Sequence, residues 1–318
     1  MTDKTKLMTD RRGFLVGSAT LAAFWGLGLK AHAQLTPTAK SFLVVGDWGR
    51  DGTSHQQDVA NAMGKVAAEK KASFVASVGD NFYDNGVTSV TDPQWKTSFE
   101  DVYKAPSLQV PWYVALGNHD YRGNAKAQID YSKTSTRWRM PSRYFALTAD
   151  KTGLSGVDIF VIDTTPLVDS YRTGTKRPAL EAVWAEAPES LQLNWLEAAL
   201  AASKAKMKIV LGHHTLYSGG KHGDTPEMQA KILPILKRQG VKAYICGHDH
   251  DLQHIERDGI AYILTGAGSE TREVKAIEGT KFAVARSGFT AYDLVKEGLK
   301  VSYIDYEAKV LFEAVVRA

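Results

Sequence analysis

Short apolar runs recur along the chain, and each run stops at a glycine that is followed by a polar side chain. The runs cover residues 42–45, 74–78, 112–116, 209–211 and 243–246. Runs that are apolar at consecutive positions are typical of strands covered on both faces. The glycine allows a sharp turn and leaves the polar residue at the carboxyl end of the strand, where open α/β sheets place their sites.

Helical patterns lie between these runs. Apolar residues spaced three and four apart predict amphipathic helices across residues 59–67 and 193–200. Thr225-Pro226-Glu227 combines a capping residue with a proline suited to the first helical position, and Gly240 follows at helix-end spacing. We therefore expect helices that cover the predicted strands.

The pattern of apolar and turn residues changes after residue 253, where it predicts β-hairpins. Asp258-Gly259 and Glu297-Gly298 are turn signals, each lying between two strand-like runs. A β-rich second half beside an α/β first half favours an α/β fold built as a four-layer αββα sandwich. In this fold, two packed mixed β-sheets are flanked by helices, and we expect a metal site at the carboxyl ends of the strands.

Composition narrows the protein class without changing this picture. The chain has 318 residues, 44% of them apolar, which indicates a folded protein of enzyme size. Its single cysteine, Cys246, cannot form an intrachain disulfide and lies in an apolar run that predicts burial. A net charge of +4 is too small to indicate nucleic-acid binding.

The N-terminus resembles a twin-arginine export signal. Arg11 and Arg12 precede an apolar stretch over residues 14–29, and Ala31-His32-Ala33 supplies small residues at cleavage spacing. We expect residues 1–33 to be a signal peptide and residues 34–318 to form one domain that is periplasmic or secreted. The export machinery is then a partner, and no membrane contact is expected after cleavage. An uncleaved membrane anchor is the less favoured alternative, because the stretch is short for a spanning helix.

Metal-capable side chains gather directly after the apolar runs. Five of the nine histidines do so, together with carboxylates and an amide, and Tyr83 follows Asp80 by three residues. Oxygen and imidazole donors suit first-row ions such as Fe, Mn and Zn, and a phenolate favours a trivalent ion. Taken singly, Asp47 is typical of a turn, and Tyr83 of a packing residue. Five repeats of one template make coincidence a poor explanation.

Five motifs in this order resemble those of the calcineurin-like metallophosphoesterases. They are Asp47-x-Gly49, Gly79-Asp80-x-x-Tyr83, Gly117-Asn118-His119-Asp120, Val210-x-x-His213 and Gly247-His248-x-His250. Tyr83 narrows the resemblance to purple acid phosphatases. The segments at 79–83 and 301–305 are similar to the small, tartrate-resistant branch, and the resemblance covers roughly residues 40–315.

The resemblance implies a binuclear metal centre. A ferric ion would be held by Asp47, Asp80, Tyr83 and His250. Asp80 would bridge to a second divalent ion, Fe, Zn or Mn, held also by Asn118, His213 and His248. His119 and His222 match the two catalytic histidines that lie beside the phosphate without binding metal.

The function implied is that of an exported acid phosphatase acting on small phosphomonoesters. Two cations about 3.5–4 Å apart clamp a phosphate and generate a hydroxide that attacks phosphorus directly. The alternative is a dimanganese phosphodiesterase or nucleotidase of the same superfamily, against which Tyr83 argues. A redox-active iron protein or a binding module is a third possibility. The oligomeric state does not follow from the sequence.

Other polar residues carry weaker expectations. His214 neighbours a candidate ligand and is expected to point the opposite way, in a structural role. His55 and His254 are expected at the surface. Asp120 either orients the histidine before it or lies in solvent. The proline-containing stretch 165–190 is expected to be a surface loop that borders the site.

Overall fold

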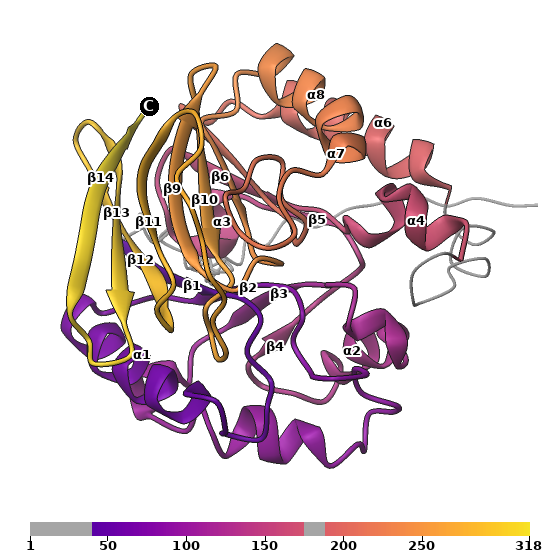
Figure 1. The fold of residues 1–318 in the computed structure, drawn as a ribbon, viewed down its shortest axis with the longest axis vertical. Helices are drawn as coiled ribbons and strands as arrows, with labels where there is room; N and C mark the ends of the chain where they lie inside the picture. Colours follow the sequence, from indigo (N-terminus) through magenta and orange to yellow (C-terminus); the bar gives the residue numbers. More distant parts are fainter. Residues whose placement is uncertain (1–39, 175–187) are drawn as a thin grey trace, which may run out of the picture. The chain divides into compact units, whose positions relative to one another are not determined.

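The computed structural model describes residues 40–174 and 188–318. The predicted signal peptide and the middle of the predicted loop at 165–190 lie outside these residues. Within them, two seven-stranded mixed β-sheets pack together with helices outside, which confirms the predicted fold class (Figure 1). No helix in the described ranges has the length and apolar character needed to cross a membrane.

The first sheet has the strand order β14-β13-β12-β1-β2-β3-β4. Its parallel part consists of β1 (Ser41–Val45), β2 (Val75–Val78), β3 (Trp112–Ala115) and β4 (Trp138–Arg139). Its antiparallel part consists of β12 (Gly288–Val295), β13 (Gly298–Asp305) and β14 (Val310–Arg317).

The second sheet has the order β11-β9-β10-β8-β7-β6-β5. Four strands run parallel: β6 (Val157–Val161), β7 (Met207–Leu211), β8 (Ala243–Cys246) and β10 (Ile260–Thr265). Three pair antiparallel: β5 (Phe145–Leu147), β9 (Leu252–Arg257) and β11 (Thr280–Val284).

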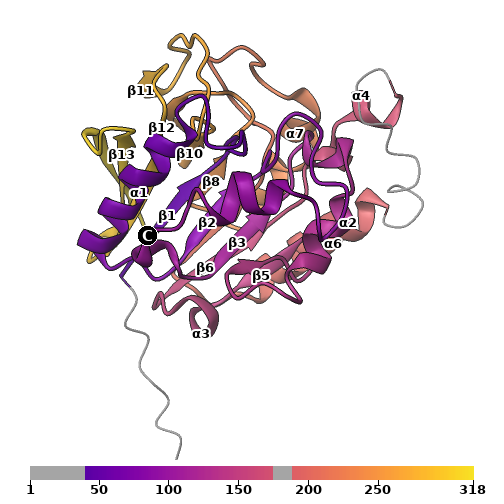
Figure 2. The ribbon, with the colours of Figure 1, turned by 90° about the horizontal axis from the view of Figure 1, so that it is seen from below.

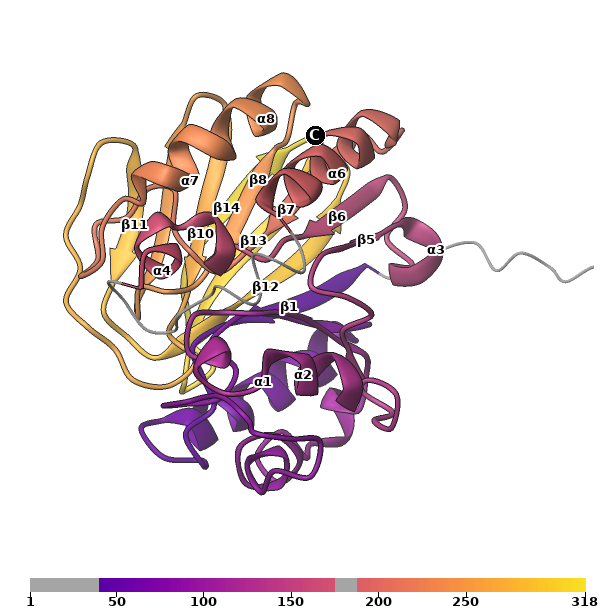
Figure 3. The ribbon, with the colours of Figure 1, turned by 90° about the vertical axis from the view of Figure 1, so that its right-hand side faces the viewer.

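Helices cover the outer faces of both sheets. Figure 3 shows α1 (Gln56–Lys70) and α2 (Ala125–Tyr131) on the side of β1, and α6 (Glu189–Ala202), α7 (Pro226–Lys231) and α8 (Leu233–Arg238) on the side of β7 and β8. In Figure 2, α1 and α2 lie over the first sheet. The shorter helical segments are η1 (Trp95–Glu100), η2 (Pro106–Leu108), η3 (Asp120–Arg122), α3 (Ala149–Thr152), η4 (Thr165–Leu167) and α4 (Asp169–Arg172).

The central strands are apolar at consecutive positions because each of their faces meets a different core. Phe42 and Val44 of β1 belong to the same buried cluster as Ile209 of β7, between the sheets. Leu43 and Val45, which point the other way, belong to a second cluster that includes the apolar face of α1. The predicted coverage on both faces is confirmed.

The predicted helices and hairpins also form, with one difference. Both turn signals join antiparallel strands, and α1 and α6 contain the two predicted helical patterns. The helix predicted from Thr225 to Gly240 is instead two short helices that meet at Ile232. Pro234 explains the break, because proline lacks the N–H that a continuous helix requires and fits only a first turn.

Candidate metal centre

The carboxyl ends of five strands from both sheets converge at one place. β1, β2 and β3 are adjacent and parallel in the first sheet, and β7 and β8 are adjacent and parallel in the second. Each of these strands is followed by a glycine and then by a candidate ligand. Residues widely separated in sequence therefore share one site, as the sequence predicts.

The glycines are required because the ligands leave no room for a side chain. A Cβ at Gly247 would lie 2.1 Å from Oδ2 of Asp47, and a Cβ at Gly117 would lie 2.2 Å from Oδ1 of Asp80. No alanine can be accommodated at such distances without displacing a carboxylate. A glycine follows these strands because the backbone there approaches the carboxylates of the candidate ligands too closely for any side chain.

Tyr83 lies at the centre of one group of donors. Its hydroxyl lies 3.0 Å from Oδ1 of Asp47, 3.1 Å from Oδ2 of Asp80 and 2.9 Å from Nε2 of His250. All four side chains are buried. Two carboxylates, a phenol and an imidazole so close together form a donor set that fits a hard cation.

His213 lies at the centre of the second group. Its Nε2 is 3.2 Å from Oδ1 of Asn118, 3.1 Å from Nδ1 of His248 and 3.4 Å from Oδ2 of Asp80. The same Asp80 oxygen therefore faces both groups. The structure brings all seven candidate ligands together, and Asp80 lies between the two halves.

Local backbone geometry supports a functional role for three of these residues. Asp47, Asp80 and His248 have positive φ angles of 59°, 49° and 70°. This left-handed region is uncommon for residues other than glycine, and such strain concentrates at functional sites. Two of these residues also contact each other: Oδ2 of Asp47 accepts a hydrogen bond from the backbone N–H of His248 at 3.0 Å.

Burial and neighbouring charges shift the pKa values of the buried donors strongly. Burial, reinforced by Asp47 and Asp80, raises the pKa of Tyr83 well above its usual value. Burial and the surrounding histidines lower the pKa of His248 well below its usual value. Burial disfavours a charged His213, yet Asp80 raises its pKa to about 9. Cations bound here would relieve the mutual repulsion of the carboxylates.

Backbone carbonyls orient two of the histidines. The Nδ1 of His213 lies 3.0 Å from the carbonyl oxygen of Val78, and the Nδ1 of His119 lies 2.7 Å from that of Asp84. A carbonyl oxygen only accepts, so each Nδ1 carries the proton and donates it. Once His213 gives up its second proton, as it must to bind a cation, its Nε2 has a lone pair facing the donor group, as a metal ligand requires.

The two outer histidines border a cavity of about 330 Å³ above the donor groups. Nε2 of His119 lies 3.9 Å from Oδ2 of Asp80, and its ring packs against Tyr83. The ring of His222 stacks on that of His248 with 4.2 Å between centroids. Burial lowers the pKa of both His119 and His222. His119 and His222 therefore both border the space next to the donor groups.

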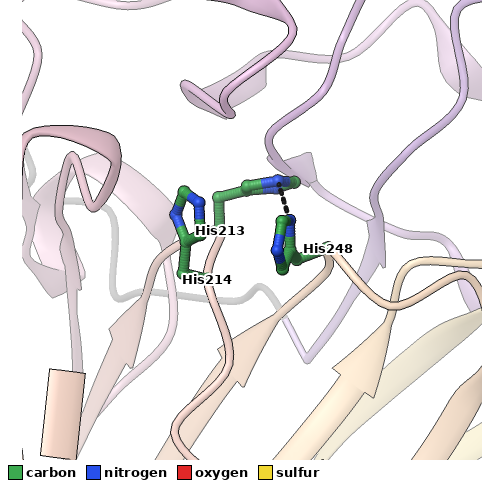
Figure 4. Close-up of side chains that lie close together, drawn as sticks. All are labelled: His213, His214 and His248. Carbon is green, nitrogen blue, oxygen red and sulfur yellow. Dashed lines mark hydrogen bonds between the residues drawn. The ribbon is translucent and has the colours of Figure 1, made fainter. Parts of the chain in front are cut away.

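Two expectations about histidines are wrong. His214 does not point away from the site: Figure 4 shows it beside His213 and His248, and the three offer nitrogens within 4.8 Å of one another. Its own ring nitrogens face hydroxyls, with Nδ1 2.8 Å from Oγ1 of Thr164, so we keep the structural interpretation. His254 is not at the surface but is 1% exposed inside β9. His55 is exposed, as expected.

Asp120 fits neither of its two expected roles. It is fully buried, and its carboxylate accepts hydrogen bonds from the backbone N–H of Gly117 and of Asn81 and from Nε2 of Gln128. It therefore fixes the loops that carry two candidate ligands, while Asp84 orients His119. The stretch after Thr165, where described, is helical and partly buried in η4 and α4 rather than an open loop.

Sequence reasoning assigned no role to the basic side chains of the site, although it expected the loop at residues 269–272 to border the substrate. The Arg50 guanidinium lies 3.8 Å above the centre of the Tyr83 ring, and Arg122, Lys221 and Arg272 line the cavity. No spacing rule marks these positions, because they come from the short helix η3 and from loops, whose paths depend on the whole fold.

Comparisons with known proteins agree with this geometry. A model of the family described as calcineurin-like phosphoesterase matches residues 40–252. Purple acid phosphatase 17 of Arabidopsis thaliana is 45% identical over 72% of this chain and 68% of its own length. Tartrate-resistant acid phosphatase type 5 of Oryctolagus cuniculus is 36% identical over 91% of this chain and 96% of its own.

The chain belongs to the purple acid phosphatases, within the calcineurin-like phosphoesterase family. Among solved structures, GAP50, titled the anchor in the inner membrane complex of Plasmodium, is 26% identical with a TM-score of 0.73 and covers 87% of this chain and 88% of its own. A purple acid phosphatase from yellow lupin seeds shares the fold, with 16% identity and a TM-score of 0.62 over 87% of this chain and 54% of its own.

Membership of this family settles the general activity of the site. The protein is a phosphoric monoester hydrolase. Its relatives imply a binuclear metal centre, and the clustered carboxylates and histidines supply groups able to bind metal.

Proposed function

We propose that the protein is an exported acid phosphatase whose centre holds a ferric ion and a divalent ion, Fe, Zn or Mn. Asp47, Tyr83 and His250 would hold the ferric ion. Asn118, His213 and His248 would hold the divalent ion, and Asp80 would serve both. The observation that carries this proposal is the hydroxyl of Tyr83, within 3.1 Å of three other donors.

The metal pair, when bound, supplies an activated water and neutralises phosphate charge. The chain's own residues do the rest. His119 holds a proton at Nε2 when protonated, because its Nδ1–H is committed to the Asp84 carbonyl. That proton faces the cavity, so His119 is placed to donate it to the leaving oxygen. His222 lines the same cavity and is assigned to binding the phosphate.

Tyr83 also separates this proposal from the dimanganese alternative. A phenol with three anionic or imidazole neighbours loses its proton only when a strong cation compensates for the charge, and a trivalent ion does this best. The purple colour of the proposed centre would come from charge transfer between this phenolate and iron.

The test is metal analysis and visible absorption of protein produced through its own export route. We expect iron, a charge-transfer band and hydrolysis of an aryl phosphate. Tyr83→Phe should abolish the band, whereas Tyr113→Phe, outside the cavity, should keep it. A colourless, fully active enzyme containing only manganese would support the alternative and rule out the ferric assignment.

Export rests on residues 1–33, which we propose act as a twin-arginine signal peptide that is removed, leaving a metallophosphoesterase domain over residues 34–318. Arg11 and Arg12, the apolar stretch behind them and the small residues up to Ala33 support this. A periplasmic or secreted enzyme would follow.

A further inference from the structure

A groove of about 690 Å³ opens beside the catalytic cavity. One wall is the segment Gly219–Lys221, and the other is the segment from Glu270 to Lys275. Lys221 and Arg272 line both the groove and the cavity. The two spaces therefore meet at these two cationic side chains.

Backbone contacts fix the groove relative to the proposed metal ligands. The N–H of Arg272 donates to the carbonyl of His250 at 2.9 Å, and the N–H of Lys275 donates to the carbonyl of Gly219 at 3.0 Å. A Cβ at Gly219 would lie 1.8 Å from the Lys275 carbonyl oxygen, so only glycine permits this approach. The backbone of Arg272 is thus tied to the segment that carries His250.

The two cationic side chains at the junction are available to an anion. Neither Lys221 nor Arg272 forms an ion pair with a carboxylate of residues 40–174 or 188–318. Glu270 is engaged by Arg50 at 3.1 Å, which leaves the exposed Glu273 as the other acid on the groove wall. Arg272 donates from Nη1 to Nε2 of His222 at 3.1 Å, and the guanidinium has further N–H donors to offer.

We propose that Lys221 and Arg272 bind a negatively charged group on the leaving part of the substrate. The site would then favour phosphoesters whose leaving group carries its own carboxylate or phosphate within a few atoms of the ester oxygen. This inference rests on the proposed function. A guanidinium fork and a neighbouring ammonium suit such oxyanions, because charge-assisted hydrogen bonds are the strong ones.

The location assigns these cations to the leaving group and not to the transferred phosphoryl group. The transferred group must meet the donors around Asp80, and His119 and His222 border that position. Arg272 contacts His222 and lines both the cavity and the groove, whereas His222 lines the cavity and not the groove. A leaving group that extends from the ester oxygen into the groove would therefore pass Arg272.

A matched pair of substrates tests the proposal. Glycerol 3-phosphate and 3-phosphoglycerate carry the same primary phosphoester, but the second has a carboxylate where the first has a hydroxymethyl group. We expect wild-type enzyme to give the higher kcat/KM with 3-phosphoglycerate. Arg272→Gln should reduce this preference by about tenfold, the loss expected for one charged hydrogen bond. Lys221→Gln should reduce it less, and Arg272→Lys should restore part of it.

The preference ratio is the decisive quantity, because Arg272 also contacts His222 and its loss can slow both substrates equally. Lys104→Gln removes an exposed charge that lines neither space and should leave the ratio unchanged. The preference should also weaken as ionic strength rises. If Arg272→Gln does not fold, Lys221→Gln still decides, since Lys221 is exposed.

Different results would overturn the proposed function and the proposed leaving-group subsite. Absence of hydrolysis with an aryl phosphate and with both esters would overturn the proposed function. Hydrolysis of both esters at equal kcat/KM, or a preference that survives both Gln substitutions, would overturn the leaving-group subsite and leave the phosphatase assignment intact.

Discussion

Asp249 is expected to control turnover without binding metal. It lies between the proposed ligands His248 and His250 and is fully buried. Its Oδ1 accepts the backbone N–H of His222 at 2.7 Å, and its Oδ2 accepts the hydroxyl of Ser218. One carboxylate thus ties the loop that carries an outer histidine to the segment that carries two ligands.

The size of the effect follows from these two contacts. A hydrogen bond to a charged group contributes about 1.5–3 kcal/mol, and a buried donor left unpaired costs a similar amount. Asp249→Ala should therefore lower the free energy of unfolding by about 3 kcal/mol, because only one of the two contacts is entirely buried. At about 2–4 °C per kcal/mol for a domain near this size, Tm should fall by roughly 6–12 °C.

Turnover should fall with stability. Once Asp249 no longer holds the loop, His222 samples positions away from the phosphate, and kcat should drop by about 10–100-fold, the range typical of residues that orient a metal site. Asp249→Asn keeps an acceptor for the His222 N–H and should lose much less. The assay is kcat on an aryl phosphate at a temperature below both melting transitions, with metal content measured on the same samples.

The result that refutes this reasoning is specific. If Asp249→Ala binds both metals and turns over at the wild-type rate, the carboxylate does not position His222. If it loses metal instead, Asp249 acts through its neighbouring ligands His248 and His250.

Three further outcomes are expected. Asp80→Ala should abolish hydrolysis, because its Oδ2 faces both donor groups, and normal turnover on an aryl phosphate would count decisively against the site. His222→Ala should slow turnover while metal analysis still finds both ions; metal loss would show that His222 has another role. Replacing Arg11 and Arg12 by lysine should block export, measured by fractionation of the cell, and unimpaired export would indicate the general secretory route.

Much of the fold could be predicted because its signals are local. A strand that is buried on both faces shows this in four or five consecutive apolar residues, as β1 does, and a glycine marks where it ends. The candidate ligands follow those glycines directly. Their convergence then needs only the rule that parallel strands end on one edge of a sheet.

Strands without such a signal were not predicted. β6 lies between β7 and the edge strand β5 in the second sheet, but Asp158 interrupts its apolar run and no glycine follows it. β14, at the edge of the first sheet, has mostly exposed and partly buried positions, and Val316 is its one buried residue. An edge strand forms because it pairs with a neighbouring strand, and its own sequence does not show which strand that is.

His254 shows most clearly why side-chain environment escapes sequence reasoning. A histidine in a polar stretch is ordinarily exposed, yet β9 lies between β10 and β11, and its inner face meets the other sheet. There Nδ1 of His254 lies 3.0 Å from the hydroxyl of Tyr303, which comes from β13 of that sheet. The partner that makes burial tolerable is 49 residues away and in a different layer. Asp120 and Arg272 are cases of the same kind, since each is defined by groups that only the folded chain brings near.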